Sequence, residues 1–187
     1  CMRAFIAIEL DPAVKEYLFA QANTIAAACR RGNVTPQENL HLTLHFLGEI
    51  TPDDVEDAVQ AMWECAIRNR PFSLTLDRLG HFDRGRDAVI WAGVKKEKYL
   101  DRLYETLERS LQKNGFAREK KTLTPHITLM RQAESARPFS QILSKIPLEA
   151  QTIPVTSITY MESIRRGPKL IYRPITKIEL GNNKNKQ

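Results

Sequence analysis

Residues 39–48 read NLHLTLHFLG, and this stretch decides the fold that the sequence predicts. Polar and apolar residues alternate between His41 and Phe46, which is the period-2 pattern of a half-buried β-strand. On such a strand the side chains of His41 and Thr43 point to one face, and the leucines that follow them point to the other. The pattern therefore predicts an imidazole and a hydroxyl group side by side, on a surface held in place by its apolar underside.

The same pattern occurs a second time. His126, Ile127, Thr128 and Leu129 repeat residues 41–44 in spacing and chemistry, 85 positions later (126 − 41 = 85). A single copy would be read as the satisfied polar face of an edge strand. The chain has only four histidines, so two copies of His-aliphatic-Thr-Leu are hard to attribute to chance and favour a functional pair.

The length and composition describe a soluble globular protein. A chain of 187 residues forms one ordinary domain or two small lobes with a shared core. No apolar run approaches the ~20 residues of a membrane helix, and residues 2–8 are too short and too soon polar for a secretory signal. Cys29 and Cys65 lie in helical patterns without metal-type pairing, which favours reduced thiols and a cytoplasmic protein.

The charge balance favours an anionic partner. The net charge of +6 and the pI of about 9.3 suit RNA, although many basic proteins never touch nucleic acid. Part of the excess lies in residues 181–187, which we predict to be a flexible basic tail.

Periodicity and capping residues predict a chain of alternating strands and helices. Asp11 and Pro12 form a helix start, Thr51 and Asp54 fit a capping pattern, and Gly32 with Asn33 reads as a turn. The predicted strands are residues 3–10, 40–47, 72–79, 88–94, 125–130, 152–163 and 169–180. The predicted helices are residues 13–30, 52–69, 96–114 and 139–145.

This order predicts an α+β domain over residues 2–180, made of two lobes that are each an antiparallel sheet backed by helices. The two motif strands would then face each other across a central cleft. The glycine-rich loops of nucleoside-triphosphate and dinucleotide sites do not occur, so those functions have no support.

Two imidazoles across a groove can serve one displacement at phosphorus. One takes a proton from the attacking water and the other gives a proton to the departing sugar oxygen, because the pKa of histidine lies near physiological pH. The hydroxyl groups of Thr43 and Thr128 can donate to non-bridging phosphate oxygens, where negative charge is spread in the transition state. This is the chemistry of opening a cyclic phosphodiester, and it requires neither a metal nor another cofactor.

The paired motifs resemble those of the two-histidine phosphoesterases, and among them the RNA 2′,3′-cyclic phosphodiesterases, also called 2′-5′ RNA ligases. Further similarities lie in residues 3–8, 38–40 and 46–49 and in Pro125 and Arg131, which flank the second motif. The resemblance covers most of residues 2–180.

The resemblance implies two pseudo-symmetric lobes, hydrolysis of a terminal RNA 2′,3′-cyclic phosphate to a 2′-phosphate, and reversible 2′-5′ joining of RNA by a monomer. It also implies that His41 is the proton donor, that His126 is the proton acceptor, and that Thr43, Thr128 and Arg131 contact the phosphate. Strict alternation places Arg131 on the face opposite His126, so it reaches the cleft only if the strand ends or bulges after Leu129.

The remaining candidates have simpler interpretations. His45 lies roughly 13 Å along the strand from His41, so it is expected to line the groove rather than to catalyse, and His81 is expected at the surface. No two histidines lie four residues apart on a predicted helix with a carboxylate partner, as in a metallohydrolase site, and neither cysteine has a neighbouring histidine for a thiol nucleophile.

Aromatic and basic residues leave alternatives open. Phe5, Phe46 and Trp91 are expected in the core, although Phe5 and Phe46 could stack a base. Residues 84–86 and 165–167 are either solvated turns or basic loops at the mouth of the cleft that guide RNA. Two other functions remain possible, namely an RNA-end-binding module without turnover and a cyclic phosphodiesterase for small nucleotides.

Overall fold

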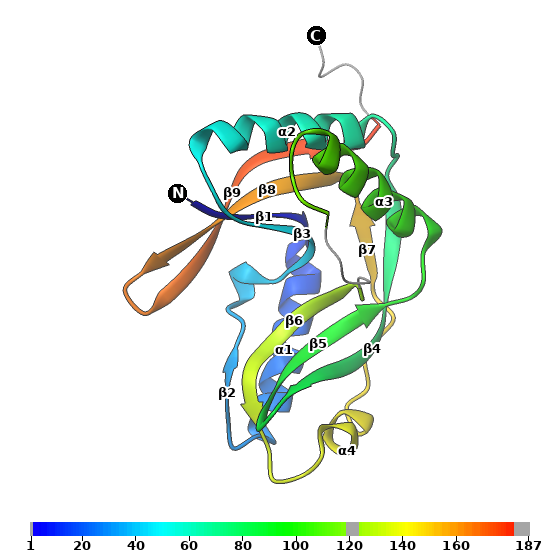
Figure 1. Cartoon of the computed structure of the whole chain (residues 1–187). Coiled ribbons are helices and arrows are strands. Elements are labelled where there is room, and N and C mark those ends of the chain that lie inside the picture. The colour runs from blue at the N-terminus through cyan, green and yellow to red at the C-terminus, as the bar shows by residue number, and fades with distance from the viewer. Residues whose placement is uncertain (1, 119–123, 182–187) are drawn as a thin grey trace.

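The computed structural model describes residues 2–118 and 124–181, and its centre is an antiparallel sheet of nine strands (Figure 1). The order across the sheet is β7-β4-β5-β6-β3-β1-β8-β9, and β2 also pairs with β6. The strands are β1 Met2–Glu9, β2 Arg31–Val34, β3 His41–Ile50, β4 Phe72–Arg84, β5 Asp87–Val94, β6 His126–Glu134, β7 Thr152–Val155, β8 Ser157–Arg166 and β9 Lys169–Glu179.

The sheet consists of two halves that meet at the motif strands. One half is β3-β1-β8-β9 and the other is β6-β5-β4-β7. Within the described residues, β3 and β6 pair only at Leu42 and Ile127, the second residues of the two motifs. The predicted α+β fold is confirmed, and the two lobes are the halves of one sheet that curls around this junction.

Helices cover the sheet, and two of them cross to the opposite half. They are α1 Pro12–Ala27, η1 Gln37–Asn39, α2 Pro52–Ala66, α3 Lys98–Lys113 and α4 Phe139–Ser144. The helix α2 runs along β8 and β9, whereas α1 follows β1 in the chain but packs on β2 and β6 of the other half (Figure 1). The helix α3 follows β5 of the second half and packs against α2, and its side chains reach β3 of the first half.

Helix starts follow from capping chemistry. The carboxylate of Asp11 accepts a hydrogen bond from the Val14 amide at 2.9 Å, with Pro12 at the first helical position. Thr51 and Asp54 form a reciprocal capping box at the start of α2. Both predicted starts are therefore confirmed.

The strand β1 is buried on both faces. Ala4, Ile6 and Ile8 belong to the main core, and Phe5 and Ala7 pack on the other face with Met161 and Tyr172. This double burial explains why residues 4–8 are continuously apolar instead of alternating. The second, smaller cluster is the floor of the cleft described below.

Two strand regions differ from the predicted elements. Gly32 and Asn33 lie in the edge strand β2 and not in a turn. Gly32 has a φ of 155°, a conformation that is strained for residues with a side chain, and a Cβ there would stand 3.1 Å from the Ala133 Cα of β6. The predicted strand 152–163 divides at Thr156 into β7, which pairs with β4, and β8, which pairs with β1 and β9.

The helices also end earlier than predicted, with α1 ending at Ala27 and α2 at Ala66. Of the predicted tail 181–187, only Gly181 lies within the described residues.

Candidate active site

A β-bulge brings Arg131 to the same side of the sheet as His126. In β6, Thr128 pairs with Trp91 and Met130 pairs with Ile90, so Leu129 is the extra residue. Leu129 and Met130 are both buried, and the alternation resumes with the opposite phase. Arg131 consequently lines the cleft. The sequence pattern predicted that Arg131 reaches the cleft only if the strand ends or bulges near Leu129, and the bulge is present.

A second bulge lies at the equivalent place in the first motif. In β3, Thr43 pairs with Ala7 and His45 pairs with Ile6, which leaves Leu44 as the extra residue. Leu44 and His45 are both buried, and Phe46 emerges on the cleft side with 59% of its surface exposed. The expectation that Phe46 belongs to the core was wrong because that expectation assumed unbroken alternation. Phe46 occupies the place in the first motif that Arg131 occupies in the second (46 + 85 = 131).

One cleft of about 860 Å³ contains all five predicted site residues. His41 and Thr43 enter it from β3, and His126, Thr128 and Arg131 enter it from β6. Its other lining residues are Phe5, Thr35, Asn39, Leu44, His45, Phe46, Phe82, Asp83, Arg84, Val89, Thr124 and Tyr172. Two motif strands that are adjacent in the sheet therefore present both histidines to one space.

The two histidines have equivalent backbone partners. His41 Nδ1 donates to the Asn39 carbonyl oxygen at 2.7 Å, and His126 Nδ1 donates to the Thr124 carbonyl oxygen at 2.8 Å. Because a carbonyl oxygen only accepts, each Nδ1 carries a hydrogen and each Nε2 is left for chemistry. Asn39 and Thr124 are also 85 positions apart, so the internal repeat extends to the groups that orient the rings.

Aromatic side chains surround each imidazole. The Phe5 ring stacks on His41 with centroids 4.8 Å apart, and the Tyr172 ring meets His41 edge-on at 5.2 Å. The Phe82 ring meets His126 edge-on at 5.2 Å, and the buried Trp91 lies 6.3 Å from it. These rings limit the rotation of both imidazoles and exclude water from the faces that they cover.

Burial lowers the pKa of both histidines. Desolvation is the main cause for His41, whose pKa falls to about 4, and the positive charges of Arg131, Lys15 and His126 lower it further against the opposing hydrogen bond to Asn39. Desolvation is also the main cause of the lowered pKa of His126, with a smaller contribution from Arg131. A bound phosphate anion would oppose these effects and favour protonation of either ring.

Asn39 anchors the start of the first motif. Its side chain is 4% exposed, and its Nδ2 donates to the Leu170 carbonyl oxygen at 2.7 Å. Its Oδ1 accepts from the Tyr172 amide at 3.3 Å. The residue that supplies the carbonyl partner of His41 is therefore fastened to β9, the outer strand of the same half.

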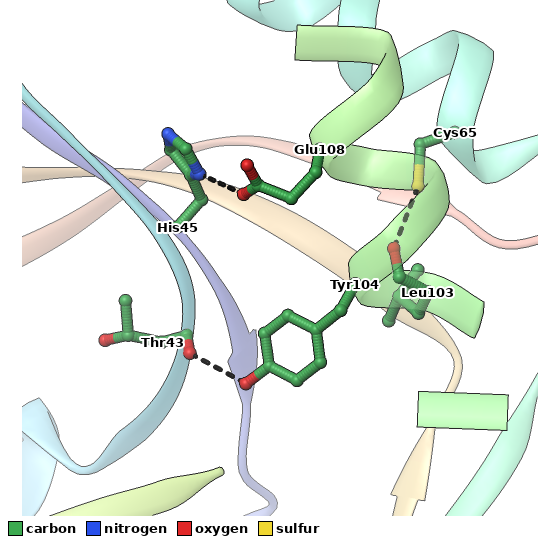
Figure 2. Close-up of polar contacts among 6 residues, drawn as sticks. All are labelled: Thr43, His45, Cys65, Leu103, Tyr104 and Glu108. Atoms are coloured by element: carbon green, nitrogen blue, oxygen red, sulfur yellow. Dashed lines mark hydrogen bonds and ion pairs between the residues drawn. The ribbon is translucent and has the colours of Figure 1, made fainter. Parts of the chain in front are cut away.

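The helix α3 supports the first motif strand from behind (Figure 2). The Tyr104 hydroxyl donates to the Thr43 carbonyl oxygen at 3.2 Å, and His45 Nδ1 lies 2.5 Å from a carboxylate oxygen of Glu108. His45 lines the cleft as expected, but it is 4% exposed because the bulge turns it toward α3. In the same figure, Cys65 of α2 contacts the Leu103 carbonyl oxygen, which links α2 to α3.

The other expectations have mixed outcomes. Phe5 and Trp91 are buried as expected, and both also contact a motif histidine. Arg84 lines the cleft, whereas Arg165 and Arg166 are not among the lining residues. Cys29 lies just beyond the end of α1 instead of within a helix.

Asn39, Tyr172 and Phe82 are site residues that the sequence interpretation missed. Asn39 lies two residues before His41, and this position was the signal that could have found it. Nothing local distinguishes Tyr172 or Phe82 from any other aromatic residue in a strand.

In the described part of the chain, no group of three or more His, Cys, Asp or Glu side chains is placed to hold a metal ion. None of the described helices is both long and apolar enough to cross a membrane.

The chain is similar to a set of known proteins. The family model described as the 2′-5′ RNA ligase superfamily matches residues 14–167. An RNA 2′,3′-cyclic phosphodiesterase of Thermotoga maritima is 36% identical over 135 residues, which are 70% of this chain and 70% of that protein. The enzyme of the same name from Geobacillus stearothermophilus is 29% identical over 168 residues, which are 88% of this chain but 54% of the relative, so the chain spans about half of that protein.

Among solved structures, Escherichia coli LigT complexed with 3′-AMP has the same fold. Its TM-score is 0.79 at 28% identity, and the match covers 97% of this chain and 99% of that chain.

Proposed function

Because the chain belongs to the 2′-5′ RNA ligase superfamily, we propose that it hydrolyses RNA 2′,3′-cyclic phosphodiester ends to 2′-phosphomonoesters by acid/base catalysis without a metal. The names of the Thermotoga and Geobacillus relatives support this activity. The observation that carries the proposal is the placement of two equivalent histidines, each with a carbonyl-bound Nδ1, in one cleft.

His126 acts as the proton acceptor. Its Nδ1 keeps a hydrogen on the Thr124 carbonyl, so Nε2 of the neutral ring is the basic nitrogen. That nitrogen takes a proton from a water molecule whose oxygen attacks the cyclic phosphorus. Its lowered pKa keeps the ring neutral and ready to accept at neutral pH.

His41 acts as the proton donor. The P–O3′ bond breaks as the new bond to the water oxygen forms, and protonated His41 gives its Nε2 proton to O3′. In the free protein this nitrogen lies 2.7 Å from the Thr43 hydroxyl. The cyclic phosphate carries a negative charge, and its arrival raises the pKa of His41 so that the ring is charged when it is needed.

Thr43, Thr128 and Arg131 bind the non-bridging oxygens. When His41 is neutral, the Thr43 hydroxyl donates to its Nε2, and when His41 is protonated that hydroxyl is free to donate to phosphate. The guanidinium of Arg131 adds a fixed positive charge where negative charge accumulates in the transition state.

An assay on a short RNA that ends in a 2′,3′-cyclic phosphate, run with EDTA present, tests the proposal. We expect His41→Ala and His126→Ala each to lower turnover by ~10²–10⁴ while substrate binding persists. His81→Ala is the control, because His81 lies outside the cleft and its Nδ1 contacts the Asp83 carboxylate instead of a main-chain carbonyl. Turnover that survives either active-site substitution, or that EDTA abolishes, would refute the mechanism.

Two related proposals concern the reaction and the protein. The reverse reaction joins a cyclic-phosphate end to a 5′-hydroxyl through a 2′-5′ bond. Incubation of the protein with two RNA halves, followed by gel electrophoresis, would detect the joined product. We also propose that the chain works as a cytoplasmic monomer, for which light scattering and cell fractionation are the tests.

Binding without turnover and a preference for small cyclic nucleotides are the competing functions. An oligonucleotide that binds but is not cleaved would favour the first, and equal kcat/KM for a cyclic mononucleotide and an oligonucleotide would favour the second.

A further inference from the structure

We propose that the cleft floor of the first half-sheet continues into a binding site for the RNA backbone, formed by Arg3 and Arg165, which holds the nucleotides that precede the cyclic phosphate. This inference rests on the proposed function, because it concerns the rest of the same substrate. It assigns a site outside the residues that line the 860 Å³ cleft.

Strand register places Arg3 on the cleft side. Along β1 the pairing with β8 is regular, so Arg3, Phe5 and Ala7 share one face. Phe5 and Ala7 form the small apolar cluster with Met161 and Tyr172, and Phe5 lines the cleft. Arg3 is therefore the next residue of the same face, roughly 7 Å beyond Phe5 at ~3.3 Å per residue.

The same register places Arg165 one step further. Ser163 pairs with both Arg3 and Tyr172, and Arg165 pairs with Leu170. Directly paired residues of antiparallel strands point to the same face, so Arg165 shares the face of Tyr172 and Arg3. The order along this face is the histidine and threonine of the motif, an apolar row, then Arg3, then Arg165.

Arg165 lies on a hairpin that extends beyond the sheet. The last pair between β1 and β8 is Arg3 with Ser163, and β8 and β9 continue past it as two strands (Figure 1). Gly167 at φ 61° allows the tight turn at the tip. A projecting hairpin lengthens the cleft floor in the direction away from the second half.

Both guanidinium groups are available for a ligand. Arg3 and Arg165 are exposed, and neither forms an ion pair with another residue in the described ranges. Glu49 is paired with Arg3 in register on β3 but makes no salt bridge with it. Unpaired arginines beyond an apolar row match a polynucleotide, whose bases are apolar and whose backbone carries one negative charge per nucleotide.

The experiment compares kcat/KM for a cyclic-phosphate oligonucleotide with that for the matching cyclic mononucleotide. We expect Arg3→Glu and Arg165→Glu each to lower the ratio of the two values by about tenfold, since each removes a charge-assisted hydrogen bond to phosphate. The salt dependence of oligonucleotide affinity should also weaken, by ~0.7 in logarithmic slope for each phosphate that is no longer neutralised. Glu49→Gln should raise the ratio.

Arg173→Glu is the matched control. Arg173 is exposed on the same hairpin and is paired with Glu162, on the face opposite Arg165, so the substitution makes the same change in net charge. If Arg173→Glu lowers the ratio as much as Arg165→Glu does, the effect comes from the net positive charge of the protein and not from a specific site. That result would overturn the proposed site. An unchanged ratio for Arg3→Glu and Arg165→Glu would also overturn it.

Failure of the proposed function gives a different result. In that case the unsubstituted protein cleaves neither substrate, and fluorescence anisotropy with the same oligonucleotide decides the site without turnover. Weaker binding by Arg165→Glu than by Arg173→Glu supports it, and equal binding overturns it.

Discussion

At the scale of single residues, the chemistry depends on imidazole rings that are oriented by main-chain carbonyl groups and not by carboxylates. A carboxylate partner would favour the charged ring, whereas Asn39 and Thr124 offer neutral oxygens. Burial then keeps both rings largely neutral in the free protein. The negative charge of the substrate raises the pKa of His41 and favours its protonated form, which is the acid of the reaction. Protonation of His41 is therefore coupled to phosphate binding.

The lowered pKa of His41 predicts how stability changes with pH. Its pKa is about 4 in the folded protein and that of an ordinary histidine, 6.5, in the unfolded chain. Between these values the unfolded chain binds more protons, so the free energy of unfolding rises as pH increases from about 4 to 6.5 and then levels off. Urea unfolding at several pH values should show a shallower rise for His41→Gln than for the original protein. His81→Gln is the control, and an identical pH slope for His41→Gln would contradict the assignment.

At the scale of elements, neighbouring strands and helices fix the motif strands in place. Asn39 ties the start of β3 to β9, and α3 holds the middle of β3 through Tyr104 and Glu108. The bulges in β3 and β6 then decide which side chain follows each threonine into the cleft.

Removing the Asn39 side chain should disturb catalysis more than substrate binding. Asn39→Ala frees β3 from β9, so the carbonyl partner of His41 is no longer held, and we expect kcat to fall about tenfold with KM little changed. Asn69→Ala is the matched control, because Asn69 is also a buried asparagine with two short hydrogen bonds, but it lies between α2 and α3. Both variants should lose stability, whereas only Asn39→Ala should also shift the pH profile of kcat. Equal kinetic effects in the two variants would show a merely structural role.

At the scale of the whole molecule, the cleft lies across a junction at which the described parts of β3 and β6 form one residue pair, Leu42 with Ile127. A phosphate held by both motifs would connect the two halves where the strand pairing does not. The free protein should therefore be least protected at this junction and most affected there by a ligand.

A nucleoside 2′-monophosphate, the expected kind of product, should stabilise the fold through both halves. At 100 times its Kd the free energy of unfolding should rise by about 2.7 kcal/mol, and amide exchange at Leu42 and Ile127 should slow. Thr43→Val and Thr128→Val each remove one donor, from opposite halves, and each should reduce the rise in Tm. A rise that depends on only one of the two threonines would mean that the ligand is held by one half alone.

The sequence predicted those features that depend on local periodicity and chemistry. The paired motifs, the two capped helix starts and most of the strands belong to this class, because alternation and capping act within a few residues. The bulges at Leu44 and Leu129 depend on the strand alongside and not on the local pattern, and Phe46 was misplaced for that reason. The division at Thr156 depends on which partner strand can pair with each segment. Gly32 in β2 depends on its backbone conformation and on the nearness of the β6 backbone at Ala133.

The crossing of α1 and α3 between the halves has a consequence for ancestry. The helix α1 follows β1 yet packs on β6, and α3 follows β5 yet supports β3, so the exchange is reciprocal. A half-length ancestor with one motif could have formed this arrangement as a homodimer whose subunits traded a helix, as in domain swapping.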